Sequence, residues 1–145
     1  MSLEVEILQL AQNQIEDNTR IRSCLIGEKI FDQYPFANIA LAGGGNGGLS
    51  VWGSLDENWF LMIRITARSI QDYYDVANIL KTLWSTTGAG TPFQAMRDLG
   101  TPATYNLLSI EFQPPVGMPW QVPLNENDNV LAGTVNMKLL VRHSY

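Results

Sequence analysis

The clearest hydrophobic pattern in the chain is an alternation of apolar and polar positions from residue 59 to residue 68. The odd positions are all apolar, and the even positions become polar towards the end, with Arg64, Thr66 and Arg68. A period of two over this length is typical of a β-strand with one buried face. The pattern therefore predicts a strand that buries Trp59, Leu61, Ile63, Ile65 and Ala67.

The period becomes that of a helix immediately after this strand. Ser69, with Asp72 three residues later, has the features of an N-cap followed by a carboxylate near the positive end of the helix dipole. Gly88 is a typical stop signal. We expect a helix over Ile70–Thr86 that packs on the sheet through one apolar face. The residues of that face are Tyr73, Val76, Ala77, Leu80, Leu83 and Trp84.

The C-terminal part of the chain predicts two more strands. Tyr105–Phe112 alternates, and the alternation from 130 to 142 is the most regular in the chain. One face of this last strand carries Val135, Met137, Leu139 and Val141, and the other carries Thr134, Asn136, Lys138 and Arg142. The polar sides of the two best strands, including Phe60, Met62, Arg64 and Thr66 on the first, meet either water or another protein surface.

The N-terminal part predicts a helix and a hairpin. Apolar spacing indicates a helix from residue 3 to about residue 24, which Gly27 would end. Two short apolar pieces, Asn38–Ala42 and Leu49–Gly53, flank the glycine-rich run 43–48. This arrangement favours a hairpin with a wide, flexible tip.

The remaining segments are expected to be connections. Residues 86–104 are rich in Gly, Thr and Pro, with a short helical turn near Phe93–Asp98. Residues 113–129 contain four prolines and read as a long loop. The prediction is a single α+β domain, 1–145, with an N-terminal helical segment at 1–27 and a sheet-and-helix core at 38–142. The sheet is expected to be mostly antiparallel, with the main helix on one face.

Composition narrows the possible functions. At 145 residues and 46% hydrophobic content, the chain can bury one core. The formal net charge of −5 and the scattered arginines argue against binding to a phosphate backbone. The N-terminus lacks the features of a signal peptide, and no apolar run reaches the length of a membrane helix. The single Cys24 cannot form an internal disulfide, which suits a reducing cytoplasm or a virion assembled there.

No residue pattern supports catalysis or a cofactor. The glycines at 43–48 lead into an apparent strand without a nearby lysine, so they do not resemble a phosphate-binding loop. One Cys and one His cannot supply a zinc site, and 125–129 lacks the spacing of an EF-hand loop. His143 lies close to the end of the sequence, and no serine has a nucleophile-elbow motif. We expect no enzyme activity and no metal, nucleotide or coenzyme requirement, which elemental analysis and thermal-shift assays would check.

Several short segments, taken in order, carry a resemblance to a known family. They are a strand ending in two glycines (Ile39–Gly44), a strand ending in an arginine before a helix (Ile63–Ser69), the helix positions Ala77 and Leu83, a Pro-rich segment (Gln113–Gly117) and a closing strand with an asparagine (Gly133–Met137). Over roughly residues 38–142 the chain resembles the tail terminator (tail completion) proteins of long-tailed bacteriophages. It departs from them in the Pro-rich loop, which is rich in Asn and Asp and has no arginine.

The resemblance implies a structural virion protein of the tail and neck, assembled in the host cytoplasm. Such subunits form a homo-oligomeric ring, usually a hexamer, that caps the tail tube, ends its polymerisation and meets the head connector. The expected partners are further copies of the chain, the tail tube protein and the head–tail connector protein, with no sequence-specific nucleic acid and no membrane. The candidate interface residues are Arg64, Arg68, Met118, Trp120, Asn136, Lys138 and Arg142.

If the chain is a ring subunit, Gly43–Gly48 and Pro114–Asn129 are expected to be docking loops that neighbours order. Two alternatives stay open. One is a different connector or adaptor of the virion neck. The other is a small α+β enzyme or ligand-binding domain, for example hot-dog-like, which would need a closed pocket lined by convergent polar groups.

Overall fold

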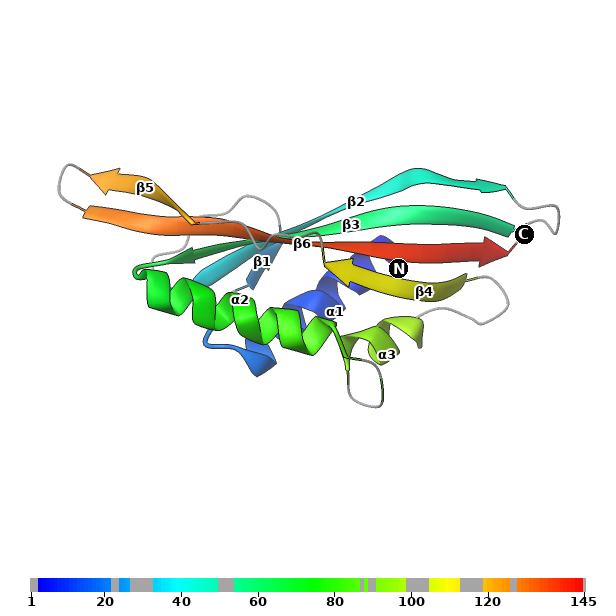
Figure 1. The fold of residues 1–145 in the computed structure, drawn as a ribbon, viewed down its shortest axis with the longest axis horizontal. Helices are drawn as coiled ribbons and strands as arrows, with labels where there is room; N and C mark the ends of the chain where they lie inside the picture. Colours follow the sequence, from blue (N-terminus) through cyan, green and yellow to red (C-terminus); the bar gives the residue numbers. More distant parts are fainter. Residues whose placement is uncertain are drawn as a thin grey trace.

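The molecule is built from a twisted sheet with helices on one side (Figure 1). The computed structural model describes residues 3–21, 24–26, 33–49, 54–86, 88, 91–98, 105–112, 119–125 and 128–144. In chain order the elements are α1 (Leu3–Asn18), β1 (Cys24–Ile26), β2 (Phe36–Leu49), β3 (Ser54–Ala67), α2 (Ile70–Trp84), α3 (Pro92–Arg97), β4 (Tyr105–Phe112), β5 (Trp120–Asn125) and β6 (Asp128–Ser144). This arrangement confirms the predicted α+β class. None of the described helices combines the length and the apolar character that crossing a membrane requires.

The strand order is β1–β2–β3–β6–β4, and β5 pairs with the first part of β6. Every strand pair is antiparallel except β1 with β2. The long central pair, β3 with β6, joins Ser54 to Ser144 at one end and Ala67 to Leu131 at the other. The sheet is therefore mostly antiparallel, as predicted.

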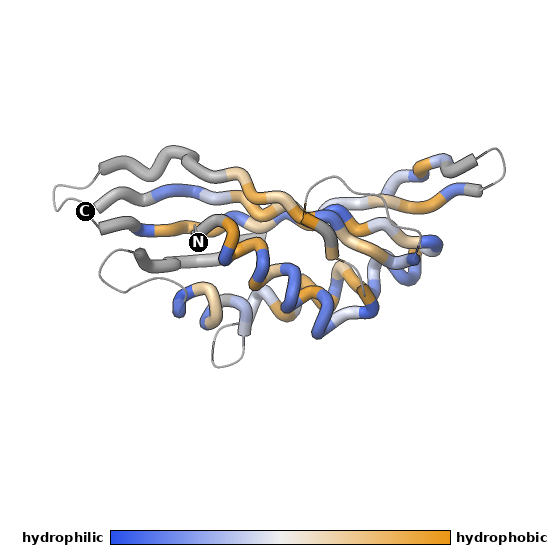
Figure 2. The backbone as a smooth tube through the Cα atoms, turned by 180° about the vertical axis from the view of Figure 1, so that it is seen from behind, coloured by the Kyte–Doolittle hydropathy of each residue, from blue (hydrophilic) through white to orange (hydrophobic). Residues whose placement is uncertain are grey.

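The core lies between the sheet and the helices. The inward positions of β3 and β6 are buried as the alternation predicts, and Tyr73, Val76, Ala77, Leu80 and Trp84 of α2 are buried against them. One hydrophobic cluster also includes Ile7, Ala11 and Ile15 of α1, Cys24 of β1 and Met96 of α3. Along the helices the backbone alternates between hydrophobic and hydrophilic residues, as expected for elements with one buried side (Figure 2).

Local signals explain the limits of α2. The Ser69 side chain accepts a hydrogen bond from the backbone N–H of Asp72, at 3.2 Å, which confirms the predicted N-cap. The helix ends at Trp84 with Ser85 as its C-cap, two residues before the predicted end at Thr86. Gly88 follows with a positive φ of 131°, a conformation that suits glycine.

The first helix is shorter than predicted, because it ends at Asn18 instead of continuing to about residue 24. Its buried stripe is already complete at Ile15, and Cys24 begins a strand. Polar side chains of α1 hold that strand. Gln12 Nε2 donates to the Cys24 carbonyl at 2.6 Å, and the Cys24 N–H donates to Glu16 Oε1 at 3.0 Å.

The predicted hairpin around residues 43–48 is wrong. These residues belong to β2, and the partner of Asn38–Ala42 is β3, in which Arg64 pairs with Asn38 and Phe60 with Ala42. Two register shifts, between Ala42 and Gly45 and between Asn46 and Gly48, accompany the glycines. Glycine is common where a strand is locally irregular. The backbone of this segment pairs with β3 although its residues show no alternation of apolar and polar positions. β3 correspondingly begins at Ser54, five residues before the predicted start.

The segment 113–129 is not one long loop. Residues 120–125 form β5, which makes a hairpin with β6 through pairs from Trp120–Ala132 to Asn125–Asp128. Pro123 lies in this strand at the edge of the sheet, where a missing N–H is tolerated. The described parts of the two segments expected to be docking loops, 43–48 and 119–125 with 128–129, thus lie mostly in strands that pair within a single chain.

Candidate functional site

The side of the sheet that faces away from the helices is the main candidate for function. All three described helices lie on the other side (Figure 1). We call this surface the open face. The residues that define it are Ala40 and Ala42 of β2, Phe60, Met62 and Arg64 of β3, Trp120 of β5, and Thr134, Asn136 and Lys138 of β6.

Strand pairing places these side chains in rows across the sheet. Met62 pairs with Ala40 on one side and with Asn136 on the other. Phe60 pairs with Ala42 and with Lys138 in the same way. Because paired residues of adjacent strands point to the same side, each row presents a continuous strip of side chains.

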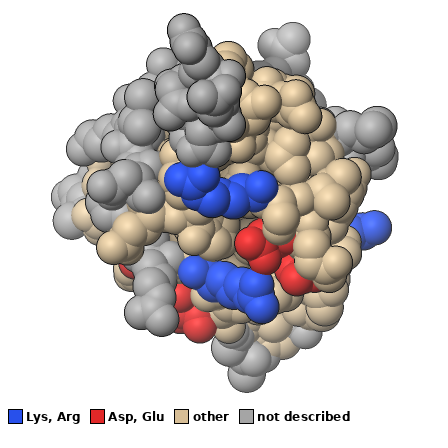
Figure 3. Space-filling view, turned by 90° about the vertical axis from the view of Figure 1, so that its left-hand side faces the viewer, with Lys and Arg blue, Asp and Glu red and all other residues tan. Residues whose placement is uncertain are grey.

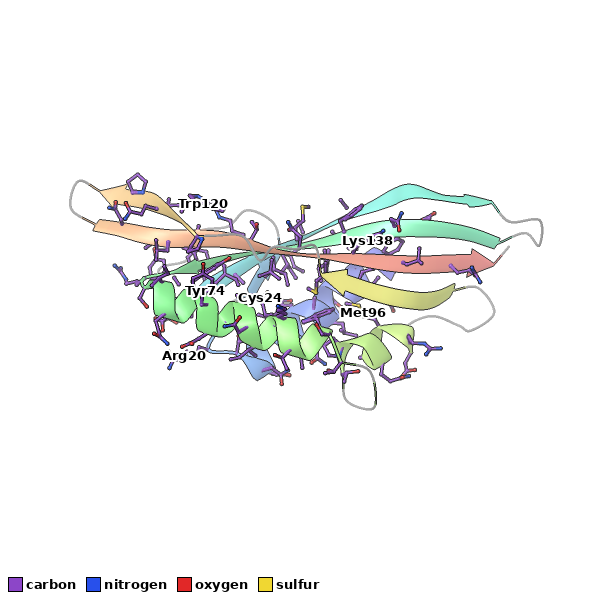
Figure 4. All side chains as sticks on the ribbon, in the orientation of Figure 1. Arg20, Cys24, Tyr74, Met96, Trp120 and Lys138 are labelled. Atoms are coloured by element: carbon purple, nitrogen blue, oxygen red, sulfur yellow. The ribbon has the colours of Figure 1, made fainter. Side chains whose placement is uncertain are left out.

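Large apolar side chains of the open face are exposed. Phe60 is 37% exposed, Met62 is 40% exposed and Trp120 is 46% exposed. Trp120 and Lys138 lie on the side of the sheet away from the helices, whereas Cys24 and Met96 lie on the helix side (Figure 4). Clustered exposed apolar side chains are typical of surfaces that contact another molecule.

The centre of the open face carries two basic residues, and one acidic residue, Glu111 of the adjoining strand β4, is paired with Lys138. The stretches 36–42, 60–66 and 132–138, which cross this region, contain Arg64 and Lys138 but no carboxylate. The guanidinium carbon of Arg64 lies 5.7 Å from the centre of the Trp120 ring, a cation–π contact that links β3 to β5. The open face therefore combines apolar side chains with two basic residues, one of which is paired with an acidic residue of β4.

The structure brings four of the seven predicted interface residues together on the open face: Arg64, Trp120, Asn136 and Lys138. Arg142 lies on β6 nearer its end, paired with Asp56 and Asn106. Arg68 lies in the bend before α2, with its guanidinium carbon 4.7 Å from the centre of the Tyr34 ring. Met118 lies outside the described residues.

Ala40 and Ala42 were not predicted to be part of the open face, because the predicted hairpin pairs their strand with residues 49–53 instead of with β3. A weak signal was available, since Ala37, Ile39 and Leu41 alternate with smaller or polar residues in this segment. The Tyr34 partner of Arg68 had no signal in the sequence.

The end of the molecule that carries β5 has mixed charge. Figure 3, which views this end, shows basic side chains next to acidic ones. Arg20 after α1 and Asp72 at the start of α2 form an ion pair with an N–O distance of 2.8 Å. An exposed pair of this kind contributes little to stability, but it joins the two helices.

The described residues contain no group of three or more His, Cys, Asp or Glu side chains that could hold a metal ion. Cys24 is buried, and this burial, together with the Glu16 carboxylate, raises the pKa of its thiol to about 12. A thiol with this pKa stays protonated at neutral pH and is a poor nucleophile.

Comparison with known proteins gives no family for this chain, since no family model matches it and no curated protein matches it. The fold and the open face are therefore the grounds for a functional proposal.

Proposed function

We propose that this chain is a structural subunit of a ring that caps the tail tube of a long-tailed bacteriophage, ends tube polymerisation and joins the tube to the head connector. The observation that supports this proposal best is the open face, on which one chain leaves Phe60, Met62 and Trp120 exposed. A protein whose work is assembly needs such a surface, and catalysis does not explain it.

The size of the sheet relative to the helices also supports the proposal. Strands β2 and β3 have 14 residues each and β6 has 17, against a usual strand length of about 5–6 residues. The strand ends project beyond the helices at both ends of the molecule (Figure 1). Sheet regions without a covering layer gain stability when a neighbouring protein packs on them.

The resemblance to tail terminators connects these features to a specific assembly. In a closed ring each subunit presents two different surfaces to its two neighbours, and further surfaces contact the tube and the connector. The open face, with its exposed apolar side chains, suits contact with a protein partner that supplies apolar groups.

The test is imaging of the purified protein alone and with tail tubes, together with light scattering. We expect closed rings and capped tubes of defined length. Monomers or dimers at all concentrations would contradict the proposal and favour the enzyme or ligand-binding alternative. Rings that bind the connector but not the tube would favour another neck adaptor.

A matched pair of variants tests the role of the open face. Met62 is 40% exposed on the open face, and Ile79 is 39% exposed on the helix side. Met62→Glu is expected to weaken capture of tail tubes at least tenfold, because it places a carboxylate in a contact that is largely apolar. Ile79→Glu is expected to leave capture unchanged. Equal effects of the two variants on capture would remove the open face from the proposal.

A further inference from the structure

The sheet has two long edges that lack a strand partner among the described residues. On one side, β1 pairs with β2 only from Ala37 to Ile39, so residues 40–49 of β2 have β3 on one edge and no described strand on the outer edge. On the other side, β4 pairs with β6 and has no described strand on its outer edge. Both segments present backbone N–H and C=O groups for pairing.

The two edges lie at the same level of the sheet. Tyr105 of β4 pairs with His143, which pairs with Leu55, and Leu55 pairs with Leu49 of β2. At the other end of β4, Phe112 connects in the same way through Met137 and Leu61 to Leu41. The edge segment 105–112 is therefore level with the edge segment 41–49 on the opposite side.

The strand directions are also suited to each other. From β2 through β3 and β6 to β4, each strand is antiparallel to the one before it, so β2 and β4 run in opposite directions. If a second copy is rotated about an axis parallel to the strands, its β2 still runs in the same direction as β2 of the first copy, and therefore opposite to β4. Placed beside β4 of the first copy, that β2 would continue the antiparallel order.

These two edges are poor in the residue types that usually prevent a sheet edge from pairing with another chain. Natural sheets usually protect an edge with charges, prolines or a short strand. Residues 40–49 contain neither a charged residue nor a proline, and β4 contains one charge, Glu111. In contrast, β5 has six residues and carries Pro123.

We propose that residues 41–49 of one copy pair antiparallel with residues 105–112 of the next copy, so that one sheet continues from subunit to subunit. The partner of each edge is thus a second copy of this chain, in a head-to-tail contact that can close into a ring. The closed ring rests on the proposed function. This mode of contact leaves the open face of every copy free for the tail tube or the connector.

Paired cysteines provide the test. Ala42 and Glu111 lie at the same level, so we would combine Ala42→Cys with Glu111→Cys and oxidise the assembled protein. Ala40→Cys with Glu111→Cys covers a stagger of two residues. Directly paired residues have Cα atoms about 4.5–5.5 Å apart, within the range of a disulfide. We expect a ladder of covalent oligomers above the dimer on a non-reducing denaturing gel.

Two kinds of control variant show whether the covalent oligomers report the proposed pairing. Each single cysteine variant can form at most a dimer, because one new thiol per chain cannot propagate. Met62→Cys with Glu111→Cys is expected to give no ladder, because Met62 lies one strand inside the edge, so its Cα would be about 10 Å from the facing strand. The parent chain reports any contribution from the buried Cys24.

The outcomes separate this pairing from the proposed function. A ladder in protein that does not capture tail tubes supports the edge pairing and contradicts the tail function. Rings that capture tubes but give no ladder with either cysteine pair overturn the edge pairing alone. A chain that stays monomeric at all concentrations overturns the edge pairing as well.

Discussion

At the scale of single residues, Gly133 decides how closely α2 approaches the sheet. It lies on β6, paired with Ile65, and a Cβ added there would overlap with the Tyr73 ring of α2. Glycine is therefore needed at this position because a helix side chain fills the space that its own side chain would occupy.

Gly133→Ala is expected to lower the free energy of unfolding by about 1–3 kcal/mol, the usual cost of overpacking a core. Urea denaturation of the two proteins would measure this change. In a Tyr73→Leu background the same substitution should cost clearly less, because the atoms that it meets have been removed. An equal cost in both backgrounds would show that the ring is not the cause.

Because of Cys24, the free energy of unfolding is expected to change with pH in the alkaline range. Burial and the Glu16 carboxylate raise the pKa of its thiol from 9.0 to about 12 in the folded chain. Below pH 9 the thiol is neutral in both the folded and the unfolded state. Between pH 9 and about pH 12 only the unfolded state loses the proton, so stability falls as the pH rises through this range.

We expect the loss attributable to Cys24 to approach about 1.4 kcal/mol per pH unit at most. The measurement is urea unfolding at several pH values from 8 to 11 for the parent and for Cys24→Ala. The tyrosines ionise in both proteins, so the difference between them isolates the thiol. Parallel pH dependence in the two proteins would exclude the thiol as the cause.

At the scale of elements, the segments with strong hydrophobic patterns were predictable from the sequence. The strand through Trp59–Ala67, the helix from Ile70 and the strand through Val130–Arg142 each bury one face, and burial imposes a visible period of two or 3.6. Their predicted inward positions are buried, except that Leu83 of α2 is only partly buried. Thr66 of β3, predicted on the outer side, is also buried, at 5% exposure.

Elements held by backbone pairing left no such pattern. The glycine-rich part of β2 exists because residues 55–58 of β3 pair with it, and β5 exists because the start of β6 pairs with it. The three residues of β1 are too short to show any period. A pairing partner distant in the sequence supplies the order in these cases, and a local pattern cannot reveal it.

The helix α2 depends on the apolar face that it turns to the sheet. Leu80 is 0% exposed in the middle of this face. Leu80→Asp is expected to unfold the subunit, because an unpaired buried carboxylate costs several kcal/mol or has to take up a proton. Circular dichroism would show the loss. Ile79→Asp, next to it on the exposed side, should leave the chain folded, and equal damage by both would contradict this explanation.

At the scale of the whole molecule, the sequence predicts which residues lie on the outer side of each separate strand, but not that these sides form one surface. Alternation assigned Arg64, Asn136 and Lys138 to the outer sides of their strands. Strand order and pairing bring these outer sides together into one surface and place the Arg64 guanidinium over the Trp120 ring. Long-range pairing is what the sequence pattern could not supply.

Trp120 tests whether this surface serves assembly. Because its side chain is 46% exposed, Trp120→Ala should change the stability of the isolated subunit by no more than about 1 kcal/mol, mostly through the lost contact with Arg64. We expect the same variant to weaken ring assembly or capture of the tail end by about 2 kcal/mol or more, as for a tryptophan anchor in an interface.

Melting of the subunit and assembly of the particle would be measured side by side. Trp84→Ala serves as the contrast, because Trp84 is 1% exposed and its loss should cost about 3–5 kcal/mol in the subunit itself. Unchanged assembly of Trp120→Ala would exclude Trp120 from the interface. A large loss of subunit stability would show that it covers the core of its own chain.

The position of β6 has a consequence for protein synthesis. β6 is the partner of β3, β4 and β5, yet it follows all of them in the chain. Until residues 128–144 have left the ribosome, β4 and β5 lack their pairing strand, and the core side of β3 is incomplete. The sheet is therefore completed late, and β3 lacks its β6 partner while residues 68–127 are being synthesised. Such a nascent chain is expected to depend on chaperones that bind extended apolar segments, and copies are expected to associate only after translation of this strand.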